Sequence, residues 1–260
     1  MFATFTPDDE ARLIAVAVHN GHDLRVDVAA IMALDDITRT REEDPYTGDW
    51  AATFPMHVVA HRSRFEVDLN RERENAVYVT PEDAWGLDVW RGIPSERIVA
   101  QSLDLFDTFY SKMETTLDRM VDAHGGFVLF DIHSYNHRRR GPDRPPEPAT
   151  DNPTVNLGTG SMPERWRPVA DAFLDTVKEH RIGDAPIDVR ENVRFRGRQM
   201  AAFVNERYGS VGCALAIEVK KIYIDEWTGR IDADAHSQVG SVLRMAGSEV
   251  TRAWSDVAGQ

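Results

Sequence analysis

Two histidines directly follow an apolar run near the start of the chain. The run is Leu13 to Val18, and the segment after it reads His19-Asn20-Gly21-His22-Asp23. Two imidazoles three residues apart in a turn can bind one metal ion, and a glycine between them lets the backbone fold tightly. Because this spacing also arises by chance in many proteins, the pair alone is weak evidence for a metal site.

A third histidine follows a second apolar run in the same manner. His133 comes directly after Phe127 to Ile132, and Asp131 is placed to orient either its ring or the backbone beneath it. Three protein ligands and one open position are typical of a catalytic zinc site. The sequence therefore predicts a metal centre of His19, His22 and His133, with zinc expected and another divalent metal as the alternative.

The segment Arg64 to Arg71 combines groups that can hold an anion. It carries two arginines with Asp68 and Asn70 between them. A guanidinium binds a carboxylate through two parallel hydrogen bonds, and an asparagine adds a further donor. A surface segment of salt bridges would have the same composition, so this alternative stays open.

Glu218 interrupts the otherwise apolar segment Ala214 to Val219. Burial of a charged carboxylate is costly unless the group is paired or its pKa rises, so this position favours a role in proton transfer. A structural ion pair with Lys220 or Lys221 is the alternative.

Strands and helices must position these residues. Four short apolar runs predict strands, at Leu13 to Val18, Met56 to Ala60, Phe127 to Ile132 and Cys213 to Val219. Apolar residues at steps of three and four predict a helix from Leu103 that ends at His124-Gly125-Gly126, and two more helices are expected at Pro163 to His180 and about Ala235 to Val257. Ser161 is expected to cap the second of these, with Pro163 in its first turn. The alternation predicts an α/β fold, a mixed and mostly parallel sheet flanked by helices.

One segment has no regular pattern. Arg138 to Pro148 is rich in arginine and proline, and its prolines exclude regular structure. A domain linker is one interpretation. Because the segment follows the strand that ends at His133, and long loops at the carboxyl ends of such strands usually bind ligands, an active-site loop is the interpretation that we favour.

Composition limits the possible partners. The 260 residues include 30 Lys+Arg and 43 Asp+Glu, a formal net charge of −13, which disfavours nucleic acids and anionic membranes. We expect one domain over residues 1–260; the sequence does not indicate an oligomeric state. Cys213 is the only cysteine, which excludes an internal disulfide and favours a reducing compartment. Since the first ten residues do not resemble a secretory signal and no apolar run approaches about 18 residues, a cytoplasmic location is expected.

Four of these segments, taken in order, resemble a known family. They are His19-Asn20-Gly21, Ser63 to Arg71, Asp131 to Ser134 and Ile217 to Glu226. Together they resemble the N-formylglutamate amidohydrolase family, which is similar in its core to zinc carboxypeptidases and aspartoacylase. The resemblance covers roughly residues 13 to 230 and implies a three-layer, zinc-carboxypeptidase-like architecture.

The resemblance also implies a role for each matching residue. His19 and His133 match zinc ligands, while His22 stands where the wider group has a glutamate, with Asp23 beside it as a substitute. Arg64 matches the arginine that polarises the substrate carbonyl, and Glu218 matches the general base. Asn70 and Arg71 match the residues that bind the substrate carboxylate. A second carboxylate would be held by arginines of Arg138 to Arg140 or Arg194 to Arg198, and we assign Arg138 and Arg198.

These roles lead to a specific expectation for the activity. The chain is expected to be a zinc-dependent amidohydrolase that cleaves a small anionic N-acyl amino acid, with N-formylglutamate giving formate and glutamate. Two alternatives are a related zinc carboxypeptidase or N-acyl amino-acid deacylase, and a non-catalytic binding protein on the same fold.

Overall fold

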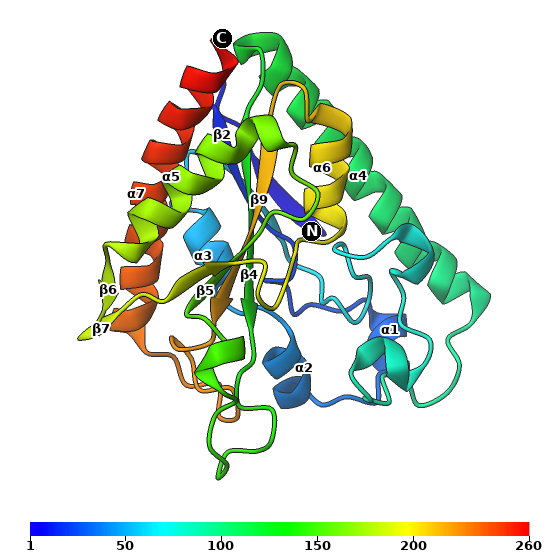
Figure 1. Ribbon diagram of the computed structural model, residues 1–260. Helices are drawn as coiled ribbons and strands as arrows, with labels where there is room; N and C mark the ends of the chain where they lie inside the picture. Colours follow the sequence, from blue (N-terminus) through cyan, green and yellow to red (C-terminus); the bar gives the residue numbers. More distant parts are fainter. Residues whose placement is uncertain (260) are drawn as a thin grey trace.

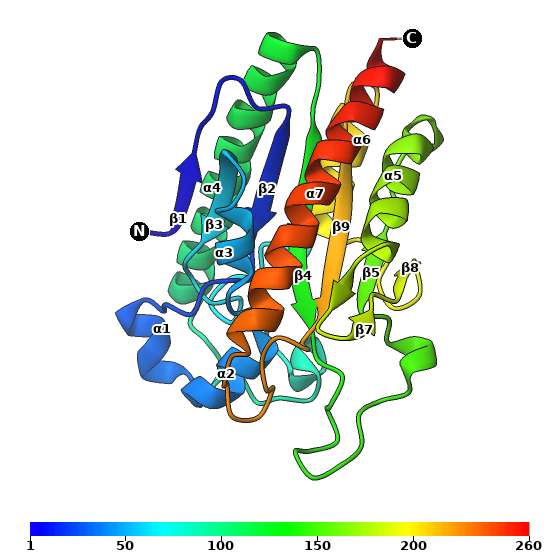
Figure 2. The same ribbon diagram turned by 90° about the vertical axis from the view of Figure 1, so that its left-hand side faces the viewer.

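A seven-stranded sheet lies between two layers of helices in the computed structural model, which describes residues 1–259 (Figures 1 and 2). The strand order is β1-β3-β2-β4-β9-β5-β8. The neighbouring strands β3, β2, β4 and β9 run parallel, whereas β1 is antiparallel to β3 and β5 is antiparallel to β9. The seven strands are β1 (Ala3–Thr6), β2 (Leu13–Ala17), β3 (Met56–Ala60), β4 (Val128–Tyr135), β5 (Val155–Gly158), β8 (Val189–Glu191) and β9 (Cys213–Lys220).

Helices cover both faces of this sheet (Figure 2). One face packs against α3 (Thr47–Ala51), α5 (Arg167–Lys178) and α7 (Ala233–Ala258), and the other against α4 (Glu96–His124) and α6 (Gln199–Tyr208). The remaining elements are α1 (Val26–Ile31), α2 (Asp36–Glu42), the small hairpin β6 (Arg181–Ile182) and β7 (Ala185–Pro186), and four short 3₁₀ turns at Arg73–Asn75, Pro81–Ala84, Ala149–Asp151 and Glu164–Trp166. None of the helices within residues 1–259 combines the length and the apolar character that a bilayer crossing requires.

Burial on both faces explains the apolar strands. Every residue of β2 and β4 is buried, because helices pack above and below them. The four predicted strands are all present, and Glu218 lies within β9 as predicted. Strand β4 extends beyond its predicted end, so that His133 also lies within a strand. The prediction of a mixed, mostly parallel sheet between helices is therefore confirmed.

The helix predictions are confirmed with different boundaries. Helix α4 starts before the predicted Leu103, because the Ser95 side chain accepts a hydrogen bond from Ile98 N, and it ends where Gly125 has a φ of 76°. Helix α5 begins only at Arg167, after a 3₁₀ turn. The prediction that Ser161 caps this helix was wrong, since its hydroxyl instead accepts a hydrogen bond from Asn205.

The parallel strands all point toward the same edge of the sheet, where the loops are long. The segment after β4 extends far from this edge, and α1 and α2 lie beside it (Figure 2). Ligands of open α/β sheets usually bind at this edge.

Candidate metal centre and active-site cavity

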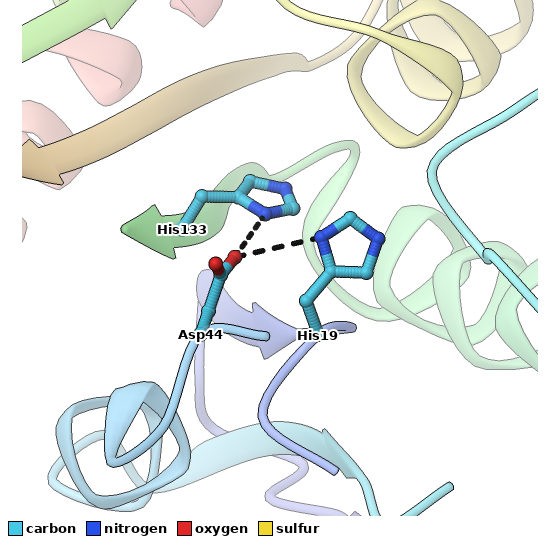
Figure 3. Close-up of side chains that lie close together, drawn as sticks. All are labelled: His19, Asp44 and His133. Atoms are coloured by element: carbon cyan, nitrogen blue, oxygen red, sulfur yellow. Dashed lines mark hydrogen bonds and ion pairs between the residues drawn. The ribbon is translucent and has the colours of Figure 1, made fainter. Parts of the chain in front are cut away.

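Three buried side chains from different segments meet at this edge (Figure 3). His19 follows β2, Asp44 lies between α2 and α3, and His133 is in β4. Asp44 Oδ2 lies 3.0 Å from His133 Nδ1 and 3.4 Å from His19 Nδ1. The three potential ligand atoms lie within 4.8 Å of one another.

Gly21 allows the turn after His19 to lie against another segment. A side chain at this position would overlap the backbone, since its Cβ would lie 2.2 Å from the carbonyl carbon of His61. The close approach therefore requires glycine.

Two further aspartates contact the Nε2 atoms of His19 and His133. Asp68 Oδ1 is 2.6 Å from His19 Nε2, and Asp131 Oδ1 is 2.9 Å from His133 Nε2. A carboxylate that accepts the Nε2 proton fixes the tautomer and leaves the Nδ1 lone pair free for a metal. Both rings therefore present Nδ1 toward Asp44, and the buried His19 Nδ1 has no hydrogen-bond partner within residues 1–259.

This donor set suits a divalent metal. Two imidazoles and a carboxylate are common zinc ligands, and other divalent ions accept them as well. The carboxylates of Asp44, Asp68 and Asp131 are all buried, and a cation at this point would offset their charge. Burial alone would raise the pKa of Asp44, but the adjacent His133 and His19 rings hold it well below its usual range.

Glu218 lies on the strand next to His133. The two residues are direct partners in the β4–β9 register, and both line the same cavity. Burial raises the pKa of Glu218 to about 7, reinforced by Asp44 and Asp131 and opposed by His133 and Arg64. A carboxyl group with a pKa near neutrality can both accept and donate a proton under ordinary conditions.

The two lysines after Glu218 do not pair with it. Lys220 Nζ donates to the backbone oxygen of Asn152, at 2.9 Å. Lys221 Nζ donates to the backbone oxygens of Arg41 and Glu43, each at 2.6 Å. An ion pair with either lysine therefore does not explain the buried position of Glu218.

Arg64 lines the cavity and binds Asp68, the aspartate that contacts His19. Its Nη2 donates to Asp68 Oδ2 at 2.8 Å, and its Nε donates to the Tyr78 hydroxyl at 3.0 Å. Tyr78 also donates to Asp68, so that guanidinium, phenol and carboxylate form one rigid group. Arg64 is therefore a fixed positive charge beside the candidate metal centre.

The cavity that contains these groups has a volume of about 460 Å³. Its lining combines arginines and aromatic rings with acidic and histidine side chains. The residues that line it are His19, Glu42, Asp44, Arg64, Asn70, Trp85, His133, Ser134, Tyr135, Asn136, Arg139, Arg194, Phe195, Arg198, Glu218 and Lys221.

The predicted substrate-binding residues occupy different places. Asn70 and Arg198 line the cavity, and both also line an adjoining pocket of about 480 Å³ that contains Arg71. Asn70 Oδ1 accepts a hydrogen bond from Met200 N, which orients the amide, and Nδ2 lies 3.0 Å from His133 Nε2. Arg138 lies outside the cavity, where its Nη2 donates to Pro142 O.

The structure does not bring His22 to the other two histidines. Its ring is 41% exposed, with Nδ1 2.5 Å from Glu43 and Nε2 2.9 Å from Arg39. The hydrogen bond to Glu43 raises the pKa of His22. Asp23, the expected substitute, is exposed, and Asp44 takes the third position beside His19 and His133.

Asp44 is the functional candidate that sequence reasoning missed. It ends the acidic triplet Glu42-Glu43-Asp44, a composition typical of solvent-exposed surface, yet all three residues are buried. The proline that follows was the only local signal of a defined turn. Arg139 and Arg194, which belong to segments noted in the sequence, line the cavity although neither was selected individually.

Comparison with known proteins identifies similar chains. The model of the N-formylglutamate amidohydrolase family matches residues 11–224. An N-formylglutamate amidohydrolase from Ralstonia eutropha JMP134 is 15% identical, with a TM-score of 0.75 over 95% of this chain and 98% of that one. No curated protein matches the sequence significantly.

Two other solved structures match most of this chain. A gene product of Agrobacterium tumefaciens is 15% identical, with a TM-score of 0.67 over 98% of this chain and 96% of that one. A metallo-carboxypeptidase from Burkholderia cenocepacia is 12% identical and gives a TM-score of 0.39 over 96% of this chain and 60% of that one.

Proposed function

Because the chain belongs to the N-formylglutamate amidohydrolase family, we propose that it hydrolyses N-formylglutamate to formate and glutamate with a divalent metal, zinc in the first instance, held by His19, Asp44 and His133. Family membership makes the chain a hydrolase of amide bonds. The metal, the substrate and the residue roles are our proposal. The observation that carries it is the convergence of two Nδ1 atoms and one carboxylate, with Glu218 beside them in the same cavity.

The bound cation would supply Lewis-acid polarisation of the amide carbonyl and would make an attacking water more acidic. Glu218 takes a proton from that water and passes it to the leaving nitrogen. Its raised pKa suits both steps, because the group releases the proton as readily as it accepts it. One C–N bond breaks, and the water supplies OH to the acyl carbon and H to the nitrogen.

Arg64 stabilises the negative charge that develops on the carbonyl oxygen. Its guanidinium is held by Asp68 and Tyr78 before substrate arrives, so little reorganisation is needed during the reaction. A preorganised donor of this kind is typically worth ~3–4 kcal/mol in the transition state.

The substrate carboxylates bind at the wall that the cavity shares with the adjoining pocket. Arg198 lines both spaces, and Arg71 lies in the second one. We assign the α-carboxylate to Arg71 with Asn70, and the side-chain carboxylate to Arg198. Arg138 is not part of this proposal, because it lies outside the cavity.

Metal removal and formate release test the proposal together. The purified protein is expected to contain about one zinc per chain and to release formate from N-formylglutamate. Chelation should abolish this release, and added zinc should restore it. Full activity after complete metal removal, or an absence of formate from the zinc-loaded protein, would overturn the proposal.

A further inference from the structure

Asn136 and Lys221 are buried residues that line the active-site cavity, with exposures of 2% and 3%. Asn136 Oδ1 forms no hydrogen bond within residues 1–259. Buried polar groups are nearly always paired, so water or a bound ligand must supply a donor to this atom.

The orientation of the Asn136 amide is fixed by its neighbours. Its Nδ2 lies 2.8 Å from Arg41 O and 3.2 Å from Glu42 Oε2, both of which only accept hydrogen bonds. The NH₂ group must face them, and Oδ1 is then left as an acceptor without a donor. A ligand at this point must therefore present an N–H or O–H group to Asn136.

Lys221 supplies the complementary donor. Its ammonium has three N–H groups, of which two are used by Arg41 O and Glu43 O. Asn136 and Lys221 both donate to Arg41 O, so their side chains lie side by side. One free donor and one free acceptor next to each other match a group that carries both, such as an amide. A carboxylate does not match, because it would face Asn136 Oδ1 with a second acceptor.

Asn136 and Lys221 lie away from the part of the cavity wall to which we assign the substrate carboxylates. Asn70 and Arg198 border the pocket of Arg71, whereas Lys221 borders the depressions on the side of Glu226. With the glutamate part of the substrate at Arg71 and Arg198, the acyl part points toward Asn136 and Lys221. A formyl group carries no substituent that could reach them.

We propose that Asn136 and Lys221 form a subsite that binds an amide in the acyl part of the substrate. This subsite proposal rests on the proposed function, because it takes the position of the glutamate part from that proposal. It then assigns the acyl part to the other end of the same cavity. It names a substrate class beyond N-formylglutamate: an acidic amino acid whose acyl group contains a second amide, as in an N-capped dipeptide that ends in glutamate. Hydrolysis breaks the amide next to glutamate and leaves the second amide intact.

Two substrates of equal length test the subsite. N-acetylglycyl-glutamate carries the second amide, and N-pentanoylglutamate has the same number of chain atoms without it. We expect kcat/KM for the amide-containing substrate to be at least about tenfold higher, as two added hydrogen bonds allow. Asn136→Ala and Lys221→Met should reduce this ratio toward one. Lys220→Met is the matched control, since Lys220 binds Asn152 O outside the cavity, and it should keep the ratio of the parent protein.

A binding measurement separates this proposal from the proposed function. Titration calorimetry on the parent protein compares N-acetylglycine with pentanoate, the two acyl products, and needs neither turnover nor a variant. We expect N-acetylglycine to bind at least about tenfold more tightly. Preferential binding without hydrolysis of any N-acylglutamate would refute the catalytic proposal and support the subsite. Formate release with equal affinity for both acyl products and a kinetic ratio of one would retain the function and overturn the subsite.

Discussion

At the scale of single residues, Glu218 is the group whose removal should separate catalysis from metal binding. Glu218→Gln keeps the size of the side chain but cannot accept a proton from water. Turnover of N-formylglutamate should fall by about 10²–10⁴-fold, the usual range for loss of a general base. Zinc content should not change, because Glu218 is not one of the three clustered ligands. Formate release and metal analysis on the same preparation check this, and unchanged turnover would remove Glu218 from the mechanism.

The pH profile gives a second measurement on the same residue. Burial raises the pKa of Glu218 to about 7, and a nearby cation would favour its ionised form and lower this pKa. Only the ionised carboxylate accepts a proton, so kcat/KM should decline as the pH falls through a midpoint at or below about 7. A Glu218→Gln variant that retains the same acidic limb would show that another group titrates there.

Asp44 and His22 are the two candidates for the third metal ligand, and one substitution at each residue distinguishes between them. Asp44→Asn should weaken zinc binding by more than about 100-fold, since even residues that only support a ligand are worth 10–100-fold. His22→Ala should leave the affinity nearly unchanged, because its ring contacts Glu43 and Arg39 instead. Zinc affinity measured against a chelator is the readout. The opposite ranking of the two variants would restore His22 to the site.

At the scale of elements, strand β5 supports the catalytic cavity through the buried side-chain amide of Asn156. Asn156 is the register partner of Glu218. Its Oδ1 accepts from Val193 N at 3.0 Å and Arg194 N at 2.9 Å, and its Nδ2 donates to Phe195 O at 2.8 Å. The loop that brings Arg194 and Phe195 to the cavity therefore depends on this side chain.

Asn156→Ala should release this loop without touching the reacting groups. Loss of the bonds leaves partly buried backbone groups unpaired, which costs about 1–3 kcal/mol of stability. We expect KM for N-formylglutamate to rise by about tenfold while kcat changes little. Val193→Ala, at an exposed position of the same loop, is the control and should retain the parent KM. A fall in kcat with unchanged KM would contradict a role confined to substrate binding.

The elements that the sequence predicted are those with strong local patterns. The strands β2, β3, β4 and β9 are apolar because they are buried on both faces, and α4 shows its apolar stripe over 29 residues. The edge strands β1 and β8 are short and half-buried, so their sequences do not differ from those of loops. His19, His133 and Glu218 could be selected because each follows or interrupts an apolar run. Asp44 could not, since its burial arises from tertiary packing that no local pattern records.

At the scale of the whole molecule, the site is assembled from segments far apart in the chain. His19, Asp44 and His133 come together only when β2, β4 and the α2–α3 connection are all in place. The unfolded chain does not hold these three groups together, so a metal that binds them adds its binding free energy to folding. The stability of the folded molecule should therefore depend on the metal.

This dependence gives a prediction for thermal unfolding. At a zinc concentration about a thousandfold above Kd, ligand binding contributes about 4 kcal/mol, which corresponds to roughly 10 °C in a chain of this size. Chelation should lower Tm by this amount, and added zinc should restore it. Because imidazole and carboxylate ligands must be unprotonated to bind, the difference in Tm should be smaller at pH 5.5 than at pH 8. Differential scanning calorimetry of both forms at the two pH values measures this, with His22→Ala as the control that keeps the full difference. A Tm that does not respond to zinc at either pH would show that the three side chains do not hold a metal in the folded protein.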